Sequence, residues 1–172
     1  GRVALFSNTT GADNTAVGAE ALYANTTGIS NTAVGEQALK ACTTGNYNTG
    51  VGLSAGAAIT TGSQNVAVGM YAGDAITTAQ ENTCIGNHSG GSLTTGGYNT
   101  AIGKSAMQNA NTGSYNIAIG PSAMWYGQTT GGNNIAIGSS AGAYLTSGQF
   151  NNAVGSGCLD ANTTGGSNTG MG

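Results

Sequence analysis

The chain repeats one short pattern of polar and apolar residues along its whole length. Each copy opens with Asn, and in nine of the ten copies the next residue is Thr, Val or Ile. A small residue and an apolar residue follow, and Gly stands four positions after the Asn. The copies follow one another as a 17-residue unit, and only the copy that opens at Asn116 is longer, by one position. A short β-rich run that ends in Gly is typical of a strand closed by a turn. The copies begin at Asn14, Asn31, Asn48, Asn65, Asn82, Asn99, Asn116, Asn134, Asn151 and Asn168.

Such a 17-residue unit is too short for the pair of helices that helical repeat families place in each repeat. We therefore expect an all-β fold, a parallel β-solenoid or β-roll with one 17-residue repeat per coil. Residues 1–172 are predicted to form a single repeat domain of about ten coils. Because the chain begins and ends within a repeat, we expect it to be a fragment of a longer fibre. Coils stacked at the strand spacing of roughly 4.8 Å would give a rod on the order of 50 Å long.

The column of residues three positions after the Asn is always apolar, and we predict that it lies in the core. Its members are Val17, Val34, Val51, Val68, Ile85, Ile102, Ile119, Ile137 and Val154.

Two further columns vary together and predict one cavity per coil. Where the residue eight positions after the Asn is Leu or Met, the residue eleven positions after it is never a large aliphatic. Where the first is Gly, the second is Ile or Leu. Two large side chains would overpack the cavity, and an empty cavity would cost stability. We therefore expect each coil to fill its cavity with one large side chain, which we call the plug. The predicted plugs are Leu22, Leu39, Ile59, Ile76, Leu93, Met107, Met124, Leu145 and Leu159.

The Asn column is predicted to form a structural ladder along the rod. A side-chain amide offers both donors and acceptors, so stacked copies can bond one another and the backbone of the turns. The ladder would run through Asn14, Asn31, Asn48, Asn65, Asn82, Asn99, Asn116, Asn134 and Asn151.

The composition narrows the functional classes. Charged residues make up only 5% of the chain and the net charge is −3, so there is no basic patch of the kind that binds nucleic acid. No apolar run approaches the roughly 20 residues that span a bilayer, and we expect no membrane insertion.

Association between chains is expected for two reasons. A thin coil with few large side chains buries little apolar surface of its own. In addition, the mostly Thr column directly after the Asn contains Val66, Ile117 and Ile135, which indicates a half-buried seam. Three chains around an axis would supply that seam, so we expect a homotrimer or a filament.

The repeat resembles a known family. N-T-A-V-G-x-x-A-L-x-x-N-T-T-G, at residues 14–28, is similar to the repeats of phage tail fibres and bacterial trimeric fibre proteins. N-I-A-I-G, at residues 116–120, is similar to the head repeat of trimeric autotransporter adhesins, a left-handed parallel β-roll. The resemblance implies a left-handed, homotrimeric fibre that is extracellular, on a cell surface or a virion, and attaches to host or prey surfaces. A cell-surface glycan or protein receptor is then a candidate partner.

Enzymatic chemistry has little support in the sequence. His88 is the only His and stands without a cluster, and the six carboxylates are in scattered coils, so we expect no enzyme, no metal site and no cofactor. Cys42, Cys84 and Cys158 are three or more coils apart, too far for intrachain disulfides, and are expected to be free thiols.

Ice binding by a rigid, low-charge solenoid with Thr ladders is the alternative function. Against it, the constant Thr pair is adjacent in sequence, so its side chains would point to opposite faces of a strand.

Exposed aromatic residues are the remaining candidates for surface binding. Tyr98 and Tyr115 share a column in adjacent coils, while Trp125 and Tyr126 lie in the one coil that is longer than the others.

Overall fold

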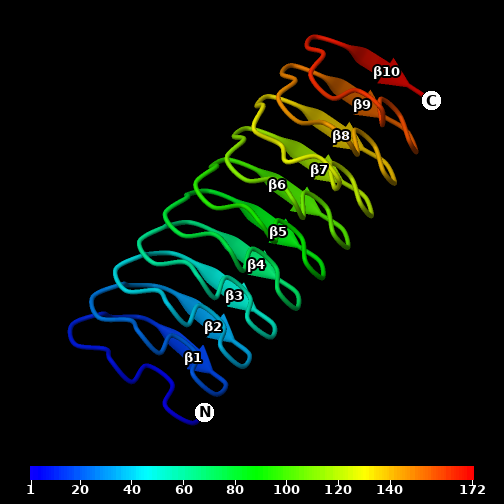
Figure 1. Cartoon of the computed structure of the whole chain (residues 1–172). Helices are drawn as coiled ribbons and strands as arrows, with labels where there is room; N and C mark the ends of the chain where they lie inside the picture. Colours follow the sequence, from blue (N-terminus) through cyan, green and yellow to red (C-terminus); the bar gives the residue numbers. More distant parts are fainter.

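The computed structural model describes residues 1–172 as a straight stack of coils, with the two termini at opposite ends (Figure 1). Ten strands of three residues each are its only regular elements. They are β1 (Thr15–Val17), β2 (Thr32–Val34), β3 (Thr49–Val51), β4 (Val66–Val68), β5 (Thr83–Ile85), β6 (Thr100–Ile102), β7 (Ile117–Ile119), β8 (Ile135–Ile137), β9 (Asn152–Val154) and β10 (Thr169–Met171).

The strands form one parallel sheet in which each strand pairs with the next one in sequence, from β1 to β10. Equivalent residues face each other across every pair, as Thr15 faces Thr32 and Val17 faces Val34. The chain thus makes about nine complete turns with one repeat per turn. The prediction of an all-β parallel solenoid with a 17-residue repeat is confirmed.

The middle residue of each strand points into the coil. Ala33, Ala67, Ala101 and Ala136 are fully buried, and Cys84 replaces Ala at the same place in β5. In β3 this residue is Gly50, where a Cβ would lie 2.8 Å from Cγ of Leu39. The interior therefore accepts only small side chains from the strands, because plugs from the opposite wall already fill it.

The prediction that the apolar third residue of each strand lies in the core is wrong. Side chains alternate between the two faces of a strand, and the inward place belongs to the small middle residue. The third residue consequently points outward, and Val17 is 55% and Val154 42% exposed. Val17, Val34, Ile85, Ile137 and Val154 are exposed, and Val51, Val68, Ile102 and Ile119 are half-buried.

The predicted plugs lie where the covariation placed them. Leu22, Leu39, Ile59, Ile76, Leu93, Met107, Met124 and Leu145 are buried, and Leu159 in the last coil is half-buried.

A competition for space explains why each coil carries one plug. A Cβ added at Gly73 would lie 2.9 Å from Cδ1 of Ile76, and one added at Gly56 would lie 3.0 Å from Cδ1 of Ile59. Such contacts are too short, so in these coils the two sites cannot both hold a large side chain.

The backbone adds a second reason for the alternation of Leu and Gly. The residue eight positions after the Asn has positive φ in both kinds of coil, for example 54° at Gly73 and 49° at Leu22. Glycine adopts this conformation at little cost, whereas other L-residues are strained by it. Leu and Met occur there because burying their side chains offsets that strain.

The Asn ladder is present and runs through the interior. Oδ1 of Asn82 accepts hydrogen bonds from the backbone N and from Nδ2 of Asn99, at 3.0 and 3.1 Å. Nδ2 of Asn99 also donates to the carbonyl oxygen of Gly113 at 2.9 Å, which ties the start of a coil to its end. The same pattern extends from Asn31 to Asn151, and these residues are at most 3% exposed.

Candidate functional site

The outer face of the sheet is a continuous surface without charge. Each strand presents its first and third residues to the outside, and these are Thr, Val, Ile, Asn or Met in every strand. We call this surface the strand face. Because the register is unbroken, residues of one kind stack in columns roughly 4.8 Å apart along the rod. Apolar and hydroxyl groups in a regular array suit contact with another ordered surface.

The predicted aromatic residues form two separate clusters. The rings of Tyr98 and Tyr115 stack with centroids 4.8 Å apart and planes 4° from parallel, and the residues are 46% and 57% exposed. Their column lies at the turn that immediately precedes the Asn ladder. The Glu81 carboxylate, one coil earlier in the same column, raises the pKa of Tyr98 through charge repulsion and a hydrogen bond.

The second cluster lies at the coil that is one residue longer than the others. Trp125 and Tyr126 have ring centroids 4.2 Å apart, and Tyr126 stacks on Tyr144 at 4.9 Å. The sequence reasoning missed Tyr144, although it follows Tyr126 at the spacing of the longer coil and so keeps the register.

A bulge accommodates the additional residue of that coil. The backbone amides of Tyr126 and Gly127 both donate to the carbonyl oxygen of Ala143, at 2.7 and 3.0 Å. Gly127 is required there, because a Cβ would lie 1.9 Å from the carbonyl oxygen of Leu145. The strands on both sides keep their register, so the insertion is confined to the turn.

A surface groove of about 310 Å³ lies beside the Tyr98–Tyr115 stack. We call it the tyrosine groove, and sequence reasoning did not predict it. It extends over three successive coils. Its lining comprises Thr78, Ala79, Gln80, Thr95, Gly97, Tyr98, Ser114 and Tyr115.

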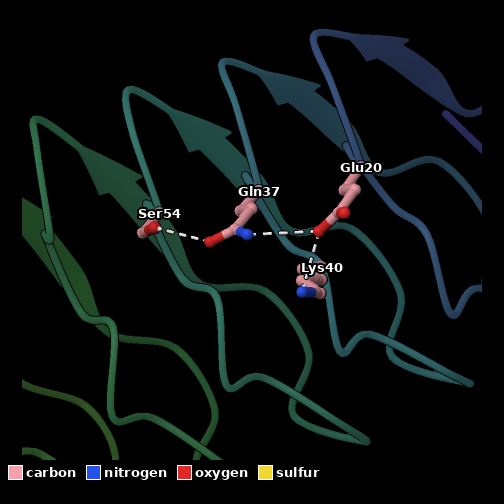
Figure 2. A network of polar contacts seen from close by, with 4 residues as sticks. All are labelled: Glu20, Gln37, Lys40 and Ser54. Atoms are coloured by element: carbon pink, nitrogen blue, oxygen red, sulfur yellow. Dashed lines mark hydrogen bonds and ion pairs between the residues drawn. The ribbon is translucent and has the colours of Figure 1, made fainter. Parts of the chain in front are cut away.

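A polar chain crosses three coils near the N-terminal end (Figure 2). The carboxylate of Glu20 pairs with Nζ of Lys40 at 2.8 Å and accepts a hydrogen bond from Nε2 of Gln37 at 3.1 Å. The hydroxyl of Ser54 donates to Oε1 of Gln37 at 3.4 Å, which continues the chain into the next coil. The hydrogen bond from Lys40 is the main cause that lowers the pKa of Glu20.

The three cysteines are free thiols. Cys84 is fully buried, and desolvation raises its pKa to about 12. Burial likewise raises the pKa of Cys42 to about 11. His88 stacks on Tyr71, with ring centroids 5.1 Å apart. No three residues of the His, Cys, Asp and Glu types converge in a way that could hold a metal ion.

No helix in the structure has the length and apolar character needed to cross a membrane.

Comparisons with protein-family models, curated proteins and solved structures give no match for this chain.

Proposed function

We propose that the chain is a shaft or head segment of an extracellular fibre, on a cell surface or a virion, that helps attach it to a host or prey surface. In this proposal three left-handed solenoids pack side by side through their strand faces. The role is mechanical and adhesive, and it needs no catalysis and no cofactor.

The observation that carries the proposal is the strand face. Its third-residue column is apolar in all ten strands, and several of these side chains are more than a third exposed in the single chain. An extended apolar surface on a soluble chain is typical of a surface that packs against a partner. Copies of the same chain carry the same columns at the same spacing, so they can match along the full length of the rod.

The interior supports the mechanical part of the proposal. Successive coils are joined by backbone hydrogen bonds at the strands, at the turns and through the Asn ladder, as between Leu22 N and Ala38 O at 3.1 Å. The links are distributed over the whole circumference of the coil. Bending or extending the rod would break several of them together, which favours a stiff spacer.

A pair of single substitutions tests the proposal by sedimentation. Val68→Lys places a charge in the middle of the strand face, whereas Met70→Lys places one two residues later, in a column where Lys104 occurs naturally. We expect the unmodified chain and Met70→Lys to sediment with three times the single-chain mass of 16.6 kDa. Val68→Lys should sediment as a single chain with unchanged circular dichroism. Equal masses for both variants would contradict packing through the strand face.

Ice binding remains the second candidate because one observation favours it. The Thr residues that open six of the ten strands point to the same side as the apolar third residue, so Thr and Val or Ile alternate on one face. Val66, Ile117, Ile135 and Asn152 interrupt this Thr column, which counts against ice binding. The adjacent Thr pair, which argued against ice binding, belongs to a different part of the coil. A single-chain mass together with measurable thermal hysteresis would favour this candidate over the fibre.

A further inference from the structure

The tyrosine groove contains a backbone donor without an acceptor in the chain, at a place where three other coils supply one. The relevant column is the second residue before each Asn. The backbone amide of Ile29 donates to Oδ1 of Asn46, one coil later in this column, at 2.8 Å. The amide of Asn46 donates to Oγ of Ser63 at 3.0 Å. The amide of Gly97 donates to Oγ of Ser114 at 3.2 Å.

At the step from Gln80, the next residue in this column is Gly97, which has no side chain. The amide of Gln80 donates no hydrogen bond within the chain. Gly97 lies between Gln80 and Ser114 in its column, and all three residues line the groove. The donor and the space for an acceptor are therefore in the same place.

Other backbone amides of this column likewise donate no hydrogen bond within the chain, namely those of Ala12, Ser63, Ser114, Gly132 and Gln149. At these steps the residue one coil later adjoins no stacked tyrosines, whereas Gly97 adjoins the Tyr98–Tyr115 pair. The combination of an unfilled acceptor place and an aromatic wall occurs once in the chain.

The remaining lining determines the chemistry of a ligand. The side chains of Thr78, Thr95 and Ser114 carry hydroxyls, which can both donate and accept hydrogen bonds. The side-chain amide of Gln80 can do the same. The tyrosines add aromatic surface that is apolar on its faces and polar at its hydroxyl. No Lys, Arg or His lines the groove, and the Glu81 carboxylate lies close to Tyr98, so an anionic ligand would be repelled.

We infer that the tyrosine groove binds a neutral saccharide. A sugar hydroxyl oxygen accepts the hydrogen bond from the Gln80 amide above Gly97, and the neighbouring hydroxyls bond the Thr and Ser side chains. The C–H groups of the sugar ring pack on Tyr98 and Tyr115. The volume of about 310 Å³ is at the small end of small-molecule sites, which suits one or two sugar rings.

This inference rests on the proposed function, because it names the kind of surface molecule that the fibre would contact. The groove is nevertheless built from a single chain, so its failure can be separated from that of the fibre. A trimer that binds no neutral glycan would refute the groove alone. A single chain that binds neutral glycans would refute the trimer alone.

The experiment applies the purified chain to an array of neutral and acidic oligosaccharides, and then measures the affinity of the strongest neutral ligand by calorimetry. Gly97→Ser supplies the missing hydroxyl and fills the groove, and Ser63 and Ser114 show that Ser fits this column. Gly166→Ser makes the same change outside the groove. We expect Gly97→Ser to weaken binding roughly tenfold or more, and Gly166→Ser to leave it unchanged.

The aromatic wall is tested in the same way. Asn133 occupies the column of Tyr98 and Tyr115 with a similar backbone, φ 59° against 61°, so the double variant Tyr98→Asn/Tyr115→Asn preserves the turn. It should also weaken binding roughly tenfold, whereas Tyr47→Asn should not. Preference for acidic glycans, the absence of any neutral ligand, or undiminished binding by Gly97→Ser with an unchanged unfolding midpoint would each overturn the inference.

Discussion

Each coil has a strand side, which runs from the Asn to the Gly four positions later, and a turn side, which comprises the rest of the repeat. The two sides differ in how much sequence variation they accept. On the strand side, the Asn, the small inward residue and the outward apolar residue recur in every coil, and the register never changes. On the turn side, the coil after Asn116 accepts an additional residue, the plug alternates between two places, and aromatic clusters and a groove interrupt the repetition. The difference shows that the strand side determines the fold, while the turn side is free to vary and holds most candidate binding features.

The largest contrast is expected from inserting one residue on each side. An Ala inserted between Thr100 and Ala101 exchanges the inward and outward residues after it, directing Ile102 into the occupied interior. A Gln inserted after residue 110, combined with Ala110→Gly, copies the natural bulge at Gly127 and Gln128. We expect the first variant to lose cooperative thermal unfolding by circular dichroism, and the second to keep it. Equal losses would show that the two sides do not differ.

Removing one step of the Asn ladder should have the next largest effect. Asn99→Ala leaves the backbone amide of Asn116 and the carbonyl of Gly113 without their partners inside the coil. At about 1–3 kcal/mol for each buried unsatisfied group, we expect a loss of roughly 2–6 kcal/mol in urea unfolding.

The matched control for the ladder is Asn109→Ala on the turn side. Five other coils carry Ala at that place, namely Ala24, Ala41, Ala58, Ala75 and Ala161, so we expect no significant change. A loss as large as that of Asn99→Ala would argue against the special role of the ladder.

The alternation of the plug can be tested with a double-mutant cycle. Ile76→Ala empties the cavity of its coil and should cost about 2–5 kcal/mol. Gly73→Met alone overfills the cavity and should cost about 1–3 kcal/mol. The double variant copies the natural pair Met107 and Ala110, so it should recover much of the loss in the same urea measurements. Additive losses would contradict a shared cavity.

The smallest effect is expected at the surface ion pair of Glu20 and Lys40. Lys40→Ala removes a contact that is open to solvent, and Ala57 shows that Ala fits the column. We expect only a small decrease in the unfolding midpoint at neutral pH. Since the folded state lowers the pKa of Glu20, its contribution is present above the ordinary carboxyl range and disappears as the pH falls below it. Midpoints measured from neutral to acidic pH in both proteins test this sign.

The repeat made most of the fold predictable, because residues at the same position of successive repeats lie next to one another in the stack. The covariation of Leu22 with Asn25, and of Gly73 with Ile76, located the plugs without any structure. The Asn ladder followed from its constant spacing and from the amide's capacity for hydrogen bonds.

The polarity of the strand residues did not predict which of them points into the coil. Ala67 and Val68 are both apolar, and only the space left by the plugs decides that Ala points inward. The tyrosine groove was missed for a related reason. Gly97 lines the groove together with Gln80 of the preceding coil and Ser114 of the following one. The sequence does not show which backbone amide lies next to Gly97.

Solution X-ray scattering of the unmodified chain tests the central claim, lateral packing of identical solenoids through their strand faces, most directly. We predict a rod about 50 Å long, the length of ten stacked strands, with three times the mass of one chain. A rod of that length with the mass of one chain would contradict lateral packing. A threefold mass in a rod three times as long would show end-to-end association and contradict it equally.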